Sequence, residues 1–252
     1  HYKTISSLLS HFGVKVELIT GSKKPKFKGQ KVDVLIGTHA LLYNKFNLKN
    51  LRLVVIDEQQ RFGVAQRAEI RKKGEKVNLL TMTATPIPRT VALTLYGNLN
   101  LSYLSEMPKG RKIVKTWLVP LNKRDSAYRW IEGKVKEGNQ VFIVCPFIEE
   151  SESMVSVKSA TKEFERLKNE VFPNLNLGII HGKLKSKEKQ AVLDKFREDK
   201  IDILVATPVV EVGVDFPNAT IILIEGADRF GLAQLHQLRG RVGRSDKQSY
   251  CL

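Results

Sequence analysis

Two arginines near the end of the chain have the chemistry of phosphate-binding groups. Arg241 and Arg244 lie in the segment AQLHQLRGRVGR, each directly after a glycine. The spacing of Leu235, Leu238 and Val242 predicts a helix with one buried stripe, in which the glycines allow a bulky group to approach the backbone. A guanidinium group beside bare backbone suits a phosphate. The alternative is a solvated basic face.

A pair of carboxylates farther upstream has the chemistry to bind magnesium and activate water. Asp57 and Glu58 end the apolar run that begins at Leu51. Such a run predicts a strand buried on both faces of a parallel sheet, and ligands bind beyond the carboxyl ends of such strands. Asp57 would bind a phosphate-bound Mg²⁺, and Glu58 would take a proton from attacking water. The alternative is that both acids only cap the following turn.

Short polar residues recur where other predicted strands end. Hydroxyl groups and backbone amides at such positions can contact sugar and phosphate, although each one is also compatible with an ordinary turn. They are Gly37, Thr38, His39, Thr83, Thr85, His181 and Thr207. The two histidines have no cysteine or histidine at metal-ligand spacing, so no metal site is expected there.

The elements that must position these groups are predicted to alternate between strand and helix. Valine- and isoleucine-rich runs predict one parallel sheet in each half of an α/β protein. They are 14–20, 32–38, 51–58 and 77–85, then 140–147, 175–182, 201–207 and 220–227. A helix capped by Ser186 is expected to bury Val192, Leu193 and Phe196, and Pro88 is expected to begin another helix that Gly97 ends.

The segment 107–124 separates the two predicted sheets. It contains two prolines and six basic residues without one acid, which suits a linker exposed to solvent or to a phosphate backbone. We place the boundary near Thr116 and predict domains at residues 1–115 and 116–252.

The composition favours a polyanionic partner. The 252 residues include 42 Lys and Arg against 26 Asp and Glu, which gives a net charge of +16 and a pI near 9.8. Nucleic acid is the expected partner, and an acidic membrane surface is the competing one. No apolar stretch reaches the roughly 18 residues of a membrane span, and the first residues lack the zones of a signal peptide. With two cysteines, no disulfide framework is expected, and the cytoplasm is the expected compartment.

Several of these segments resemble the motifs of superfamily 2 helicases. DEQQ at 57–60 is similar to the Walker B box, TAT at 83–85 to motif III, ATPVVEVGVD at 206–215 to motif V, and QLRGRVGR at 237–244 to motif VI. From end to end, strings such as GTHALL and TMTATPIPRTVALTLYG resemble bacterial DNA helicases that remodel stalled replication forks and Holliday junctions. The transcription-repair coupling translocase is an alternative, although ALTLYGNLNLS and MPKGR fit the fork-remodelling helicases better.

The resemblance implies two RecA-like lobes, with parallel sheets flanked by helices, that hydrolyse ATP with Mg²⁺ and move along forked or branched DNA as a monomer. Asp57 would serve magnesium and Glu58 water activation, while Arg241 and Arg244 would be arginine fingers from the second lobe. Nucleotide binding and its coupling to DNA would fall on Gln60, Thr83, Thr85, Gly213, Asp215 and Gln237. Contacts with the DNA backbone would fall on Gly37, Thr38, His39, Arg89, His181 and Thr207. At position 60 the family usually carries histidine, and glutamine can still form hydrogen bonds there.

The phosphate loop of such an enzyme is missing from the sequence. No G-x-x-x-x-G-K-[ST] occurs, and GSKKPKFKG at 21–29 has neither the spacing nor the hydroxyl after lysine. We expect the Walker A strand to precede His1, and the chain to be a piece that binds DNA but hydrolyses ATP poorly or not at all by itself. The alternative is a non-enzymatic basic module that docks on nucleic acid. A GKT sequence encoded ahead of His1 would favour the motor.

Overall fold

Contacts divide the chain into two compact units, His1–Pro86 and Ile87–Leu252. The structure, a computed structural model, describes residues 1–21, 32–43, 50–59, 62–63, 77–83, 100–108, 110–146, 153–208 and 216–252. The domain boundary near Thr116 stays a prediction, because residues 84–99, which include the division between the units, lie outside the described residues.

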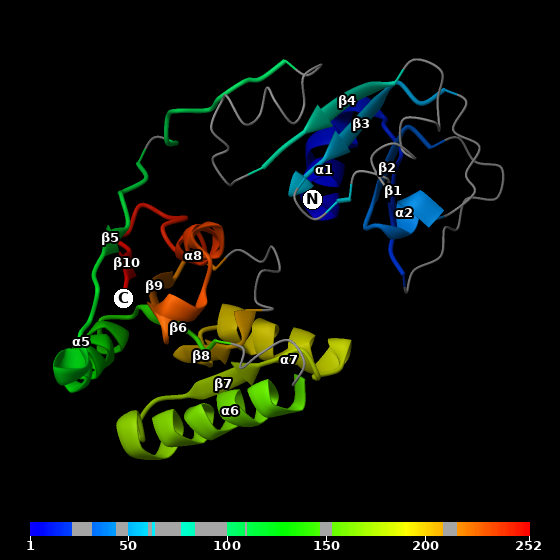
Figure 1. Cartoon of the computed structure of the whole chain (residues 1–252). Coiled ribbons are helices and arrows are strands. Elements are labelled where there is room, and N and C mark those ends of the chain that lie inside the picture. Colours follow the sequence, from blue (N-terminus) through cyan, green and yellow to red (C-terminus); the bar gives the residue numbers. More distant parts are fainter. Residues whose placement is uncertain are drawn as a thin grey trace. The chain divides into compact units, whose positions relative to one another are not determined.

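The first unit contains two pairs of parallel strands (Figure 1). The pairs are β1 (Val16–Ile19) with β2 (Val34–Gly37), and β3 (Leu53–Ile56) with β4 (Asn78–Thr81). The helical segments that the structure describes in this unit are α1 (Tyr2–Leu9), a 3-10 turn at Ser10–Phe12, and α2 (Ala40–Tyr43). The four strands predicted for the first half of the chain are thereby confirmed.

Strand β3 is less buried than the sequence predicts. Ile56 is 3% exposed, but Leu53 is 56% and Val55 is 51% exposed. Because successive side chains of a strand point to opposite faces, Leu53 and Val55 share the face that remains accessible. The prediction of burial on both faces is therefore wrong for β3.

The second unit is built on a six-stranded parallel sheet with the order β5-β10-β9-β6-β8-β7. Its strands are β5 (Lys115–Thr116), β6 (Gln140–Val144), β7 (Leu177–Ile180), β8 (Ile203–Ala206), β9 (Ala219–Ile224) and β10 (Tyr250–Cys251). The four longer strands confirm the prediction. Strands β5 and β10 were not predicted, because two residues show no periodicity.

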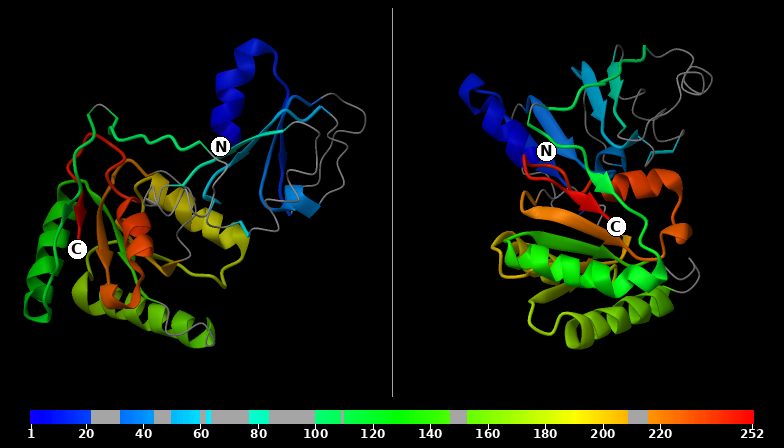
Figure 2. Two further views of the ribbon diagram at one scale, coloured as in Figure 1. Left: turned by 45° about the horizontal axis from the view of Figure 1, so that its top comes forward. Right: turned by 90° about the vertical axis from the view of Figure 1, so that its left-hand side faces the viewer.

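Helices cover both faces of this sheet (Figure 2). They are α5 (Arg124–Lys136), α6 (Ser153–Arg166), α7 (Ser186–Arg197) and α8 (Leu232–Arg239), with shorter turns at Leu121–Lys123, Leu167–Val171 and Ala227–Arg229. One core cluster joins the sheet to α5 and α6, and the other joins it to α7 and α8. The second unit is thus a three-layer α/β domain, with helices on both faces of a parallel sheet.

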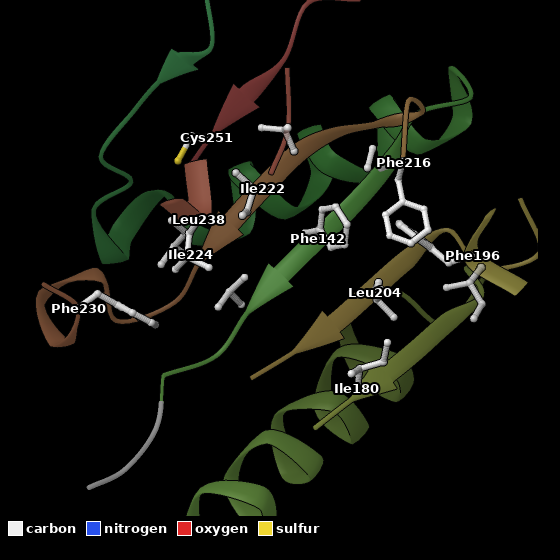
Figure 3. Close-up of a cluster of buried hydrophobic side chains, with 14 residues drawn as sticks. Phe142, Ile180, Phe196, Leu204, Phe216, Ile222, Ile224, Phe230, Leu238 and Cys251 are labelled. Carbon is white, nitrogen blue, oxygen red and sulfur yellow. The ribbon is translucent and has the colours of Figure 1, made fainter. Parts of the chain in front are cut away.

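Strand β6 shows why the sheet is buried on both sides. All five of its residues are buried. Val141 and Ile143 belong to the cluster with α5 and α6, while Phe142 and Val144 belong to the cluster with α7 and α8. Figure 3 shows the second cluster, in which Phe142 lies among side chains from both neighbouring strands and both helices. For β6 the predicted burial on both faces is confirmed.

Helix α7 begins one residue earlier than its predicted cap implies. Lys185, not Ser186, is the N-cap residue, and its backbone N–H donates to Glu188 Oε2 at 2.7 Å. Glu188 satisfies this N–H because it lies three residues into the helix. The predicted stripe is confirmed, since Phe196 is fully buried and Val192 and Leu193 pack against the same core. The helix predicted to begin at Pro88 lies outside the described residues.

A polar network joins α5, α6 and the end of β9. Arg124 donates to the Tyr128 hydroxyl at 2.7 Å and lies 2.9 Å from Glu225 Oε1, while Tyr128 donates to the same carboxylate at 3.0 Å. Arg166 donates to Tyr128 at 3.0 Å and to Glu163 at 2.6 Å. Burial and the Glu225 carboxylate raise the pKa of Tyr128, which keeps its hydroxyl protonated. Arg124, predicted to be a basic residue of an exposed linker, instead anchors the start of α5.

Both cysteines of the chain lie inside the second unit. Cys145 and Cys251 are both free and buried, and burial raises the pKa of the Cys145 thiol to about 12. Among the helices that the structure describes, none is long and apolar enough to cross a membrane.

Candidate functional site

Asp57 and Glu58 follow β3 directly, at the carboxyl end of a parallel strand pair. Asp57 Oδ1 accepts the backbone N–H of Glu58 at 2.9 Å, and Asp57 Oδ2 lies 2.8 Å from His1 Nε2. Glu58 has a φ of 51°, a left-handed conformation that costs a residue with a side chain about 1 to 2 kcal/mol. Uncommon backbone of this kind is enriched at functional sites.

The acidic pair suits a magnesium ion whose other ligands are waters and phosphate oxygens. The Asp57 side chain is 43% exposed, so it remains accessible to a ligand. Within the described ranges, no group of three or more His, Cys, Asp or Glu side chains is arranged to hold a metal. Mg²⁺ is usually bound through one or two carboxylates together with waters and phosphate oxygens. The donors therefore suit a phosphate-bound ion better than one enclosed by protein.

Thr83 lies near the same end of this strand pair. The register pairs Ile56 with Thr81, so Asp57 and Thr83 follow neighbouring strand ends. The Met82 N–H donates to Ile56 O at 2.8 Å, which holds the two strand exits together. Thr83 is exposed. Three other predicted residues of this half, Gln60, Thr85 and Arg89, lie outside the described residues.

The segment Gly37-Thr38-His39 forms the exit of β2. A Cβ on Gly37 would lie 2.4 Å from the Ile19 carbonyl oxygen, so packing alone requires glycine there. Thr38 Oγ1 accepts the Ala40 N–H at 3.5 Å, and the His39 ring stacks on Phe62 with centroids 4.2 Å apart. Packing therefore explains why residue 37 is a glycine, independently of any ligand.

In the second unit, His181 and Thr207 follow neighbouring strand ends. Ile180 of β7 pairs with Ala206 of β8, and the Thr207 N–H donates to Ile180 O at 3.2 Å. Thr207 is fully buried, yet its Oγ1 has no hydrogen-bond partner in the part of the chain that the structure describes. His181 Nδ1 is also buried and, among the same residues, equally without a partner. Two such atoms at one sheet edge point to a ligand.

Lysines surround this edge, which the sequence analysis missed. Lys189 Nζ donates to Gly182 O at 3.1 Å, so its ammonium group is held over the loop that follows His181. Burial, then Lys189 and Lys183, lower the pKa of His181, and Glu188 opposes them. The alternation of lysines in KLKSKEK indicates only a solvated helix face. Their place beside the end of β7 becomes visible only in the fold.

The two candidate arginines are not on a helix, so that prediction is wrong. Helix α8 ends at Arg239, and Gly243 has a φ of 77°. Arg241 and Arg244 therefore lie in the turn that follows the helix, where both are half-buried and Arg244 Nε donates to Gly240 O at 3.3 Å. After Gly240 the backbone N–H groups of Arg241 and Val242 donate to Leu238 O and Arg239 O, only three residues back, and left-handed Gly243 then excludes a further helical turn.

The apolar stripe predicted with these arginines is confirmed. Leu238 and Val242 are 1% and 3% exposed, and Leu235 packs against the same core. Gln237, the predicted nucleotide contact on α8, is half-buried. The predicted nucleotide contacts Gly213 and Asp215 lie outside the described residues.

We expect Gly243→Ala to destabilise the second unit by about 1 to 3 kcal/mol, through left-handed strain and overpacking. An added Cβ would lie 2.8 Å from Val114 Cγ2. Urea unfolding monitored by tryptophan fluorescence reports this unit, because Trp117 and Trp130 both belong to it. Gly240→Ala is the matched control, since Gly240 has a φ of −70° and a Cβ there would meet no atom closer than 3.4 Å. Equal free energies of unfolding for the two variants would contradict the conclusion that the backbone and packing at position 243 require glycine.

Comparisons with known proteins agree with this geometry. Residues 1–94 match the DEAD/DEAH box helicase family, and residues 122–246 match the helicase conserved C-terminal domain. All of the chain aligns with the ATP-dependent DNA helicase RecG of Synechocystis sp. at 49% identity, and the alignment covers 31% of that protein. With the RecG of Aquifex aeolicus the identity is 50%, and 33% of that protein is covered. The chain therefore spans about a third of the length of these relatives.

Solved structures give the same picture. A structure of RecG bound to a three-way DNA junction matches all of this chain with a TM-score of 0.76 and 44% identity, and 33% of that structure's chain is covered. The Saccharomyces cerevisiae protein Dbp5, bound to RNA and ADP BeF3, matches 99% of this chain and 66% of its own, with a TM-score of 0.71. At 18% identity, that second likeness concerns the fold alone.

Proposed function

We propose that this chain, which belongs to the RecG family of ATP-dependent DNA helicases, forms most of the two motor lobes of an enzyme that uses ATP to remodel branched duplex DNA at stalled forks and Holliday junctions. The observation that carries the proposal is the 44% identity with the junction-bound RecG structure over the whole chain. The relatives reported above favour this family over the transcription-repair coupling translocase.

In this proposal the first unit prepares the nucleotide for hydrolysis. Magnesium, when bound with ATP, would neutralise phosphate charge and polarise the terminal phosphate. Asp57 holds that ion, and Glu58 accepts the proton of the attacking water. Thr83, Gln60 and Thr85 transmit the state of the nucleotide to the DNA-binding residues.

The second unit supplies cationic groups to the same reaction. Arg241 and Arg244 stabilise the charge that develops on the phosphate oxygens, as arginines do in phosphoryl transfer. Gln237, Gly213 and Asp215 contact the nucleotide. Both arginines lie directly after the buried end of α8, which limits their freedom before ATP binds.

DNA is bound through its phosphates in this proposal, without reading of the bases. The contacts are Gly37, Thr38, His39, Arg89, His181 and Thr207. The Thr207 hydroxyl has no hydrogen-bond partner among the described residues, which supports such a contact, because a phosphate oxygen would accept its hydrogen bond. In this proposal the reaction takes place on DNA in the cytoplasm, and the complete motor acts as a monomer.

We expect binding of a forked duplex to weaken steeply with salt. A protein that contacts several phosphates loses about 10³ to 10⁵ in affinity between 50 and 200 mM salt. Fluorescence anisotropy of a labelled fork measures this slope, and Lys183→Ala should reduce it by about 1. Lys136→Ala is the control, because α5 covers the sheet face opposite α7. A slope near zero for the unmodified chain would contradict DNA binding through the backbone.

A basic module that only docks on nucleic acid is the second candidate, and the excess of Lys and Arg over Asp and Glu is compatible with it. The acidic pair argues against it, because a binder of polyanions gains nothing from exposed carboxylates beside a phosphate. DNA-stimulated ATP hydrolysis by a chain that carries a phosphate loop ahead of His1 decides between the two. Hydrolysis supports the motor, and its absence supports the binder.

A further inference from the structure

The exits of β7 and β8 hold two buried polar atoms for which the described residues provide no hydrogen-bond partner. Thr207 is 0% exposed, and neither its Oγ1 nor His181 Nδ1 has a hydrogen-bond partner among the residues that the structure describes. The strands are in register at Ile180 and Ala206, so the two residues follow adjacent positions of one sheet edge. An unmade hydrogen bond of a buried group is costly, and native proteins rarely tolerate two side by side.

We propose that His181 makes DNA binding proton-linked, with its imidazole protonated when a backbone phosphate of the duplex contacts the edge formed by His181 and Thr207. The inference rests on the proposed DNA-binding function and adds a pH dependence to it. Thr207 Oγ1 would donate its hydrogen bond to the phosphate, and the imidazolium would add a charge-assisted one.

The groups around His181 keep the ring neutral in the absence of a ligand. On its own loop and on α7 it faces Lys183 and Lys189, with Glu188 as the opposing charge, and Thr207 follows the neighbouring strand. Burial is the main reason that its pKa lies below 6.5, and the two lysines lower it further. In addition, a protonated Nδ1–H would find no acceptor in the part of the chain that the structure describes, which disfavours the charged form.

A phosphate reverses each of these effects. Its negative charge offsets the lysines, and its oxygens accept the hydrogen bond that Nδ1–H needs. A nearby opposite charge raises the pKa of such a group by about 1 to 3 units. Between the pKa of the free chain and the higher pKa of the complex, binding therefore takes up a proton. The affinity rises as the pH falls through the pKa of the complex, and it levels off below the pKa of the free chain.

A duplex backbone fits this edge better than a single nucleotide. Four lysines lie in the ten residues from His181 to Gln190, against one acid, Glu188. Lys183, Lys185 and Lys187 are all exposed, so positive charge extends beyond the His181 loop along the start of α7. An extended track of lysines matches a series of phosphates spaced along a strand.

The direct test is an NMR titration of the histidine ring signals of the 252-residue chain from pH 5 to 8, with and without a short duplex. The His181 signal is identified by its loss in His181→Gln. We expect the duplex to raise the pKa of His181 by at least about 1 unit, which corresponds to a roughly tenfold rise in affinity across the window. His11→Gln is the control, because His11 is exposed in the first unit and should leave this shift unchanged.

Anisotropy measurements with the same duplex at pH 6 and pH 8 complete the test. The unmodified chain and His11→Gln should bind the duplex more tightly at pH 6 than at pH 8. His181→Gln should still bind the duplex, but without the increase in affinity that protonation of His181 provides. If the duplex binds and the pKa of His181 does not change, the proton-linkage proposal is wrong, while the proposed DNA-binding function is unaffected. A His181 shift caused by ATP and not by the duplex also overturns it. Failure of the duplex to bind at either pH overturns the proposed function as well.

Discussion

Replacing Arg241 or Arg244 by alanine is expected to lower kcat for DNA-stimulated ATP hydrolysis by about 10³ to 10⁵. The guanidinium groups would stabilise charge that develops only in the transition state, so KM for ATP should change far less than kcat. The measurement is steady-state ATPase activity with saturating forked DNA, in a chain that carries a phosphate loop ahead of His1.

Two controls separate this role from charge and from folding. Arg239→Ala removes a basic residue from the last position of α8, where it donates to His236 at 3.1 Å, and should leave kcat within a few-fold. Arg241→Lys keeps the charge but loses the planar fork, so it should remain strongly impaired. A loss of kcat for Arg239→Ala as large as that for Arg241→Ala would contradict the role of Arg241 in stabilising the transition state.

Replacing Glu58 by glutamine is expected to lower kcat by about 10² to 10⁴, the usual contribution of a general base. Glutamine has the same shape and keeps the Cβ, so the left-handed backbone at φ 51° is strained equally in both proteins. ATP and DNA should still bind, because the magnesium ligand Asp57 is unchanged. Single-turnover hydrolysis and equilibrium binding of a fluorescent ATP analogue measure the two effects separately.

Glu17→Gln is the matched control for Glu58→Gln. Glu17 is a half-buried residue of β1, in the same unit but away from the exit of β3. Its replacement should leave hydrolysis unchanged. Strong DNA-stimulated ATPase activity from the 252-residue chain by itself, surviving Glu58→Ala, would contradict both the base assignment and the expectation that a phosphate loop is needed.

Periodicity and residue type alone predict eight strands that the structure confirms, and they predict which groups stand at the strand exits. This succeeds because an apolar run bounded by turn residues has few alternatives to a strand. The positions of Asp57, Glu58, His181 and Thr207 at carboxyl ends follow from the chain order once the sheets are parallel. Family resemblance adds the roles of these residues.

The point at which α8 ends could not be predicted from spacing. Leu235, Leu238 and Val242 keep a helical interval, although Val242 lies beyond the helix. Beyond the helix, Gly243 adopts a positive φ and packs so closely that an added Cβ would meet Val114, a residue 129 positions earlier in the chain. Glycine permits that conformation but does not demand it.

The sequence by itself determined the α/β class, the eight longer strands, the basic charge and the residue types that can act on phosphate. Only the tertiary structure decided that Arg124 joins Tyr128 and Glu225 and is half-buried, and that His181 and Thr207 each hold a buried polar atom without a hydrogen-bond partner among the described residues. The reason is physical. Local pattern reflects which faces of each element are apolar, whereas the partner of a polar group depends on contacts between segments far apart in the chain.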